Sequence, residues 1–197
     1  MLQGEKIPHE EKVFSLFEPE TQWINKGKTW PPVELGHKVL ITTDQNQLVL
    51  DYKVMSQPSD QLETLPLAKR LFERYGEDAF GSMSFDKGFS QEETRKELEE
   101  KVNVVVMPKK GRRHAEDRAR ETAPAFLRHK DQHSAIESEI NSLEHHGLNR
   151  CPDKGIRGYK RYVGLGILAY NLHLIGKELL AKKRMVQEKS EIRQAAA

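Results

Sequence analysis

Cysteine is almost absent from this chain: Cys151 is the single cysteine among 197 residues, so no internal disulfide can form. No apolar run approaches the roughly 20 residues that a membrane-spanning helix needs, and residues 1–6 lack the apolar core of a secretory signal peptide. Several histidines could join Cys151 at a zinc ion, but their spacings match no common structural zinc site. These absences predict a cytoplasmic protein without a membrane segment and disfavour a zinc protein.

The chain has little net charge, +2 from 32 Lys and Arg against 30 Asp and Glu, but its charges are unevenly placed. Residues 108–130 carry eight Lys and Arg side chains against three Asp and Glu side chains. The basic ones are Lys109, Lys110, Arg112, Arg113, Arg118, Arg120, Arg128 and Lys130. A local excess of positive charge suits contact with a phosphate backbone, and a solvated loop is the alternative interpretation of the same residues.

The spacing of apolar residues predicts short strands early in the chain and helices between the later strands. A bulky apolar run stopped by Pro19 predicts a buried strand, and strict alternation from Leu48 to Val54 predicts one arm of a hairpin. The expected strands are residues 13–18, 36–43, 47–55, 80–85 and 102–107, with a loop at 21–32. The expected helices are residues 59–75, 91–101, 131–146 and 159–185.

This order of elements predicts one α/β domain with a mixed sheet flanked by helices and a long C-terminal helix. The domain is expected to cover residues 12–186, after a polar lead-in at 1–11 and before a flexible tail at 187–197. Residues 108–130 are expected to be a basic insertion or linker within it.

Three carboxylates stand at positions that suit a binding site. Asp86 ends the strand at 80–85, just before a predicted capping box formed by Ser90 and Glu93. In open α/β sheets, ligands are held beyond the carboxyl ends of strands, although Asp is also a common turn residue. Glu18 ends the first expected strand, and Glu137 lies at the border of the apolar stripe of a later helix.

Such a set of carboxylates suits metal-assisted cleavage or transfer of a phosphodiester. Hard divalent cations prefer oxygen ligands, and two of them about 3.5–4 Å apart can clamp the attacking and leaving oxygens of an in-line displacement. The residues alone leave open whether Glu137 is a ligand or a solvated acid on the surface of its helix.

As an ordered set, several motifs of this sequence resemble those of bacterial insertion-sequence transposases of the DDE type, of the ISNCY-like group. The motifs are Val13 to Pro19 followed by Lys26-Gly27-Lys28, Ser84-Phe85-Asp86-Lys87-Gly88-Phe89-Ser90, Met107-Pro108-Lys109-Lys110-Gly111, His133-Ser134-Ala135-Ile136-Glu137-Ser138, Gly147-Leu148-Asn149-Arg150-Cys151 and Asn171-Leu172. The resemblance covers nearly the whole chain, and its specificity comes from the order of the motifs.

The resemblance implies an RNase H-like catalytic domain with a mixed five-stranded sheet and two Mg²⁺ or Mn²⁺ ions. By position, Asp86 matches the second acid of the family's triad and Glu137 the third. Glu18 matches the first by its place after the first strand, although the family usually has Asp there. Other acids compete for that role: Glu20, Asp44 and Asp51.

The resemblance also implies a DNA interface, for which Lys109, Lys110, Arg112, Arg113, Lys130 and His133 are the candidates. Many relatives of this class have Tyr, Arg and Lys at the positions held here by Lys130, His133 and Glu144. The first two could still meet phosphate, whereas Glu144 could not.

The implied activity is metal-dependent cleavage and strand transfer of DNA, with element ends and target as substrates, by an oligomer in the bacterial cytoplasm at the nucleoid. Such transposases usually carry an N-terminal domain that binds the element ends, and here the first expected strand begins at once, so we expect a truncated copy. Two alternatives remain: an inactive remnant that binds DNA or an intact transposase, and a nuclease that only hydrolyses DNA.

Overall fold

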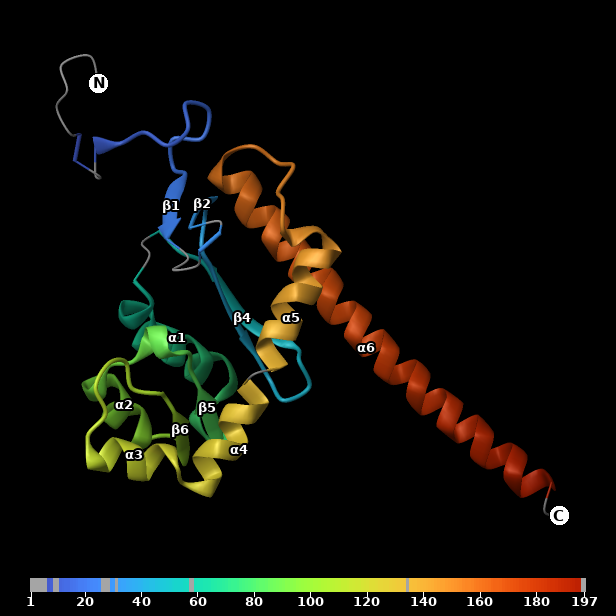
Figure 1. The fold of residues 1–197 in the computed structure, drawn as a ribbon. Helices are drawn as coiled ribbons and strands as arrows, with labels where there is room; N and C mark the ends of the chain where they lie inside the picture. Colours follow the sequence, from blue (N-terminus) through green and yellow to red (C-terminus); the bar gives the residue numbers. More distant parts are fainter. Residues whose placement is uncertain are drawn as a thin grey trace. The chain divides into compact units, whose positions relative to one another are not determined.

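The structure is a computed structural model (Figure 1). It describes residues 7–8, 11–25, 29–30, 32–56, 59–133 and 135–195, with backbone alone at 135 and 192–195. Contacts divide the chain into two compact units, which are treated separately below. Unit 1 comprises Met1–Ile41, Tyr52–Pro58 and Leu143–Ala197, and unit 2 comprises Thr42–Asp51 and Ser59–Ser142.

Unit 2 is built around a parallel pair of short strands, β5 (Ser82–Ser84) and β6 (Val104–Val106). Their register pairs Ser82 with Val104 and Ser84 with Val106. Parallel neighbours need a long connection, and α2 (Glu92–Glu99) supplies it. Helix α2 and α4 (Pro124–His133) both pack against β6, while α1 (Asp60–Tyr75) packs against the turns on either side of β5.

The core of unit 2 gathers where these elements meet. Leu67, Ala68 and Leu71 recur at helical spacing on α1 and are at most 4% exposed. Val105 and Val106 in β6 and Met107 directly after it are all buried, which confirms the prediction of a strand covered on both faces. The predicted helices at 59–75 and 91–101 are confirmed, because α1 and α2 lie within them.

The predicted start of α2 is wrong in detail. Gln91 is the N-cap residue, and no side chain caps the helix. Ser90, which was expected to cap it, ends a short 3₁₀ turn, Lys87–Phe89, and its hydroxyl accepts a hydrogen bond from the Lys110 amide at 3.3 Å. The Ser-x-x-Glu pattern therefore serves a contact between two segments rather than a cap.

The basic segment is largely helical. Helix α3 (Ala115–Glu121) begins with a reciprocal cap between His114 and Asp117. Helix α4 begins at Pro124, a residue favoured at the first helical position because its missing amide hydrogen would be unpaired there anyway. The helix predicted at 131–146 corresponds to the end of α4, then α5 (Ala135–Leu143) and a π-helical turn, Glu144–Leu148.

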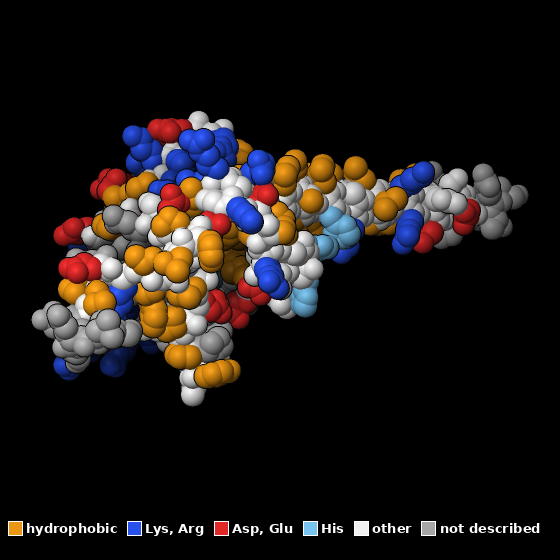
Figure 2. Space-filling view, turned by 90° about the horizontal axis from the view of Figure 1, so that it is seen from above, with side chains coloured by type: hydrophobic (Ala, Val, Ile, Leu, Met, Phe, Trp, Pro, Cys, Tyr) orange, Lys and Arg blue, Asp and Glu red, His pale blue; other side chains and the backbone are white. Residues whose placement is uncertain are grey.

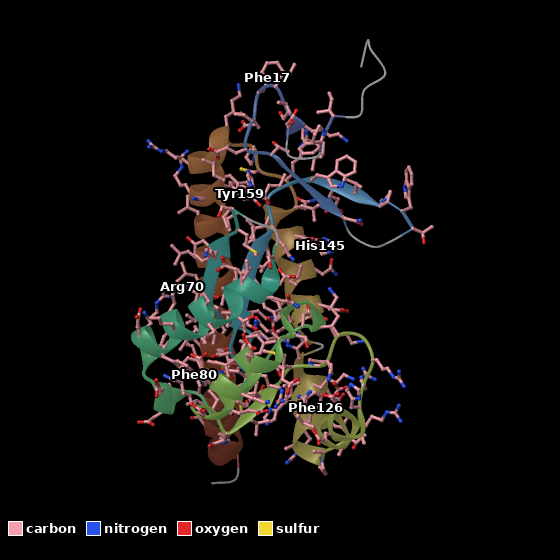
Figure 3. The ribbon with its side chains drawn as sticks, turned by 90° about the vertical axis from the view of Figure 1, so that its left-hand side faces the viewer. Phe17, Arg70, Phe80, Phe126, His145 and Tyr159 are labelled. Carbon is pink, nitrogen blue, oxygen red and sulfur yellow. The ribbon has the colours of Figure 1, made fainter. Side chains whose placement is uncertain are left out.

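In unit 1, residues 13–18 were predicted as a strand and do not form one. Leu16 and Phe17 are 89% and 93% exposed, and Figure 3 shows Phe17 at the outside of the ribbon. The Ser15 hydroxyl accepts the Glu18 amide hydrogen at 3.0 Å, so the chain turns where a strand would continue. Strand β1 (Gln22–Asn25) forms instead, in a segment predicted as a loop, and pairs antiparallel with β2 (Val33–Gly36).

The C-terminal part of unit 1 is a helix of 41 residues, α6 (Gly155–Ala195). It contains the helix predicted at 159–185 and continues through most of the expected tail. The preceding π-helical turn ends at Leu148. Gly147 within it has a non-helical φ of +102°, at the position where the sequence predicts that the helix ends. Val163, Ile167 and Tyr170 form the buried face of α6.

The described strands form three sheets of two strands each rather than one mixed sheet of five. The third pair is a hairpin of β3 (Val39–Thr43) and β4 (Val49–Val54), as predicted from the alternation around Asp44. The mixed α/β class and the long C-terminal helix are confirmed, and an RNase H-like sheet is not what the described residues form. No helix in the described part of the chain is long and apolar enough to cross a membrane.

Asp51, in the middle of β4, joins the hairpin to α1 within unit 2. Its carboxylate is 5% exposed and accepts hydrogen bonds from Arg70 Nη2 at 2.8 Å and from Arg70 Nε at 3.2 Å. Arg74 Nη1 lies 3.3 Å from the other carboxylate oxygen. Removing one of these arginines should destabilise the fold, because the charge of the buried Asp51 carboxylate would then be left without its full compensation.

Replacing Arg70 by Met should therefore lower the free energy of unfolding by about 2–4 kcal/mol, because it keeps the aliphatic stem and deletes the main partner of Asp51. Urea unfolding followed by circular dichroism measures this change. Lys69→Met is the control: it removes a neighbouring i,i+4 pair whose side chains are 78% and 65% exposed, and such a pair contributes less than about 0.5 kcal/mol. Equal losses in the two variants would contradict the role given to Asp51.

Candidate nucleic-acid cleavage site

Asp86 lies directly beyond the carboxyl end of β5, as the sequence predicts. The Phe85 amide donates to the Val106 carbonyl at 2.8 Å, which closes the parallel pair, and the next residue is Asp86. The Asp86 carbonyl accepts the Phe89 amide hydrogen at 3.0 Å in the 3₁₀ turn. The Asp86 side chain is 78% exposed and points into solvent that a substrate could occupy.

The basic loop starts at the same edge of unit 2. Because β5 and β6 are parallel, their carboxyl ends lie side by side, and residues 107–113 leave β6 where Asp86 leaves β5. The hydrogen bond from the Lys110 amide to Ser90 Oγ fastens this loop to the turn that follows Asp86. An exposed carboxylate and a run of basic side chains are thus placed next to each other by the strand pair.

The basic side chains of this loop divide into paired and open ones. Lys109 Nζ lies 2.7 Å from an Asp117 carboxylate oxygen, and Arg113 Nε lies 3.0 Å from a Glu121 oxygen. Lys110 and Arg112 are exposed and make no side-chain ion pair with any described residue. The open pair is available to an external phosphate, whereas the paired ones hold the loop against α3.

A surface hollow of about 470 Å³ lies between α2 and α3 beside Lys109. It is lined by Glu92, Arg95, Lys109, His114, Ala115, Glu116, Asp117 and Arg120. Both signs of charge occur in this lining, and the Lys109–Asp117 pair neutralises part of it. The hollow therefore lacks the single sign of charge that would concentrate an anion there.

His133, at the end of α4, contacts Asp86. Its Nε2 atom lies 3.3 Å from Asp86 Oδ1, and its side chain is 20% exposed. Helix α4 is held beside β5 by a hydrogen bond from Ser84 Oγ to the His129 carbonyl at 3.3 Å. The buried Nδ1 atom of His133 has no hydrogen-bond partner among the described residues. His133, one of the candidate DNA contacts, thus touches the proposed catalytic acid.

Glu137 and Glu139 occupy different sides of α5. Glu137 is exposed, whereas Glu139 is 4% exposed and lies one turn before the buried Leu143. The inward face of α5 therefore includes Glu139, which the sequence did not single out. The signal was its spacing, four residues before Leu143 and three after Ile136, but an acid there contradicts the expected apolar stripe.

The buried Glu139 carboxyl has few hydrogen-bond partners among the described residues. Burial raises its pKa above the ordinary value of 4.5, and the nearby Asp44 carboxylate raises it further, while a hydrogen bond with the Thr43 side chain and the charge of His133 act in the opposite direction. Its Oε2 atom has no hydrogen-bond partner among the described residues. Burial is the largest effect, so the protonated form is favoured relative to an exposed glutamate.

Glu18 lies in unit 1, where both of its carboxylate oxygens accept the Gly155 amide hydrogen, at 2.9 and 3.0 Å. Gly155 is the first residue of α6, so Glu18 places negative charge at the positive end of that helix dipole. The three proposed acids are therefore distributed over two units: Asp86 and Glu137 belong to unit 2.

The competing first acids have structural partners or a surface position. Asp44 Oδ1 accepts the amide hydrogens of Asn46 and Leu48, at 2.8 and 2.9 Å, and so shapes the hairpin turn. Asp51 is the buried partner of Arg70. Glu20 is exposed in unit 1.

The remaining sequence candidates are exposed. Lys130 lies on the surface of α4, and Glu144 opens the π-helical turn before α6. Within the described residues, no three His, Cys, Asp or Glu side chains lie close enough to hold one metal ion, so these residues do not present a ready three-ligand set.

Comparison with models of known protein families, with curated proteins and with solved structures finds no match for this chain.

The buried carboxyl of Glu139 gives a pH-dependent prediction. A pKa that is raised in the folded state contributes stability at low pH, and this contribution is lost as pH rises above 4.5 and through the folded-state value. Glu139→Gln should therefore unfold at higher urea concentration than the parent at pH 8, and this advantage should shrink towards zero below about pH 4.5.

Glu137→Gln is the matched control, because it makes the same chemical change on the exposed side of α5. Urea titrations at pH 4, 6 and 8 compare the three proteins. A Glu139→Gln effect that is the same at all three pH values would show that desolvation of the carboxylate is not the cause.

Proposed function

We propose that this chain is the catalytic-core part of a DDE-type insertion-sequence transposase, which cleaves DNA strands and transfers element ends to a target. The observation that carries the proposal is the edge of the β5–β6 pair, where the exposed Asp86 carboxylate lies beside a basic loop with open Lys110 and Arg112 side chains. That combination suits a phosphodiester next to a carboxylate that can bind metal.

The order of the sequence motifs supports this proposal, because three of them meet in unit 2. Residues 84–90 contain Asp86, residues 107–111 contain the start of the basic loop, and residues 133–138 begin with His133. The first two are joined by the contact between Ser90 and Lys110, and the first and third by the contact between Asp86 and His133. Motifs that are separate in sequence therefore contribute to one surface.

The proposed reaction needs Mg²⁺ or Mn²⁺, for which carboxylate oxygens are suitable ligands. Asp86 and Glu137, which both belong to unit 2, are the residues proposed to hold the ions. When bound, the metal supplies the Lewis acidity that stabilises charge on the attacking and leaving oxygens. The chain's own contribution is an exposed Asp86 held by the 3₁₀ turn and a histidine at 3.3 Å that orients it.

The DNA is proposed to lie across the edge formed by the basic loop and the exposed face of α4. Lys110, Arg112 and Lys130 provide charge that is not already used in an ion pair with a described residue. Contacts to phosphate fix the position of the duplex without reading its sequence. A catalytic core of this kind would act on DNA in the bacterial cytoplasm.

Asp86→Asn should reduce Mn²⁺-dependent cleavage of a DNA duplex by roughly 100-fold or more, since it removes a ligand charge at the reacting phosphate. DNA binding should change little. Cleavage is measured on a labelled duplex, and binding is measured by fluorescence anisotropy. Because the Asp86 side chain is 78% exposed, the fold should survive the substitution.

Asp78→Asn, an exposed acid in the turn before β5, is the control for the loss of one negative charge in unit 2. If parent, mutant and control cleave equally, Asp86 is not the catalytic acid. If none of them cleaves but all bind DNA, the chain is an inactive remnant. Joined strands in addition to cut ones separate a transposase from a nuclease.

The open basic side chains predict the salt dependence of DNA binding. Lys110→Gln and Arg112→Gln should each reduce the slope of log K against log salt by roughly 0.9, because each removes one phosphate contact. Lys69→Gln, at an exposed position of α1, should leave the slope unchanged. Anisotropy titrations between about 50 and 200 mM salt measure the slopes, and unchanged slopes in all three variants would place the DNA elsewhere.

A further inference from the structure

Helix α6 has two apolar faces, only one of which is used within unit 1. The used face contains Val163, Ile167 and Tyr170, all at most 5% exposed. Two glycines allow neighbours to approach closely on this part of the helix. A Cβ atom on Gly164 would lie 2.5 Å from the Tyr52 hydroxyl, and one on Gly166 would lie 2.5 Å from a Leu148 methyl group.

The second face carries a row of exposed branched side chains: Leu165, Leu168, Leu172, Ile175 and Leu179, which are 60, 54, 60, 44 and 61% exposed. At about 100° per residue, the row is centred roughly 160° around the helix from the buried Val163. Figure 2 shows hydrophobic side chains along this helix. A row of large apolar side chains in water is unfavourable, so it calls for a partner surface.

The spacing of the row identifies the kind of surface. The intervals between its members alternate between three and four residues, which is the a and d pattern of a coiled coil. Leu165, Leu172 and Leu179 then occupy a positions, and Leu168 and Ile175 occupy d positions. Val186, 68% exposed, falls at the next a position, so the seam extends over three heptads.

The charges beside the seam favour a second copy in parallel orientation. In this frame Glu178 is a g residue and Lys183 is the e residue of the next heptad, which are the two positions that face each other across a parallel coiled coil. A parallel pair of α6 helices would therefore join Glu178 of each chain to Lys183 of the other, twice by symmetry. The only contact of Glu178 given by the described residues is an exposed one to Lys182 at 3.7 Å.

We propose that the exposed row on α6 is the seam of a parallel, two-stranded coiled coil between two copies of this chain. The proposal does not depend on the transposase function, because it uses residues of α6 alone. A helix about 30 Å long over residues 165–186 gives three heptads of contact. The opposite face of α6 stays packed against the rest of unit 1. Lys182, at a d position, sets the register at some cost in stability, as a polar core residue does.

Leu172→Gln tests the seam at its centre. The full-length parent should sediment at about twice 22.7 kDa, and the variant should dissociate at a concentration at least roughly 10-fold higher, because a polar amide replaces a buried leucine in both copies. Leu180→Gln, on the same helix but off the seam and 58% exposed, should leave the mass unchanged. Circular dichroism confirms that each variant is folded.

A charge exchange tests the orientation. Glu178→Lys places two lysines opposite each other and should weaken the dimer, and Lys183→Glu should do the same with two glutamates. The double variant restores opposite charges and should recover parental association. An antiparallel pair does not bring these two positions together in this way, so failure of the double variant to recover would overturn the parallel arrangement.

Sedimentation equilibrium of the full chain decides the proposal as a whole. A dimer that is weakened by Leu172→Gln but not by Leu180→Gln supports it. A monomer at all concentrations overturns it and assigns the row to another part of the same chain or to a different protein. A dimer that is insensitive to Leu172→Gln overturns it as well, because the copies would then meet through another surface. A mass of three or four chains overturns the two-stranded arrangement.

Discussion

The hydrogen-bonded pairing of β5 with β6 is the constraint on which unit 2 depends. The pair is only three residues long on each side, yet it brings together segments about twenty positions apart and buries Met83, Val105 and Val106 beneath helices. Its last hydrogen bond, from the Phe85 amide to the Val106 carbonyl, marks the point at which both strands end. Asp86 on one side and the basic loop on the other are neighbours because the strands are parallel.

The sequence predicted the parts of this arrangement that rest on local patterns. The Val104–Val106 run, the spacing of leucines on α1 and the place of Asp86 after a strand were all visible without the structure, because burial and turn geometry leave a direct signature. The stretch at 13–18 has the same bulky composition but does not form a strand, because a strand also needs a neighbouring strand to pair with and composition does not reveal one. The same limit explains why five expected strands did not become one sheet.

The candidate site was predictable only where its residues follow strands. Asp86 could be found by position, whereas Glu139 could not, because a buried acid breaks the apolar pattern that identifies the inward face of α5. The ion pairs of Lys109 and Arg113 with acids of α3 could not be predicted either, because the charged segment shows no apolar periodicity that would predict this helix. The number of basic residues is visible in the sequence, but only the structure separates the side chains in ion pairs from those without one among the described residues.

The two glycines on the packed face of α6 set the rotational phase of this helix. Tyr52 and Leu148 fill the space where side chains at 164 and 166 would stand, so the helix cannot turn by one residue without bringing a leucine into that space. The direction in which every outer residue of α6 points is thus decided by two missing methyl groups on its inner side. A substitution at Gly166 would change the outer surface of the protein without altering any residue on it.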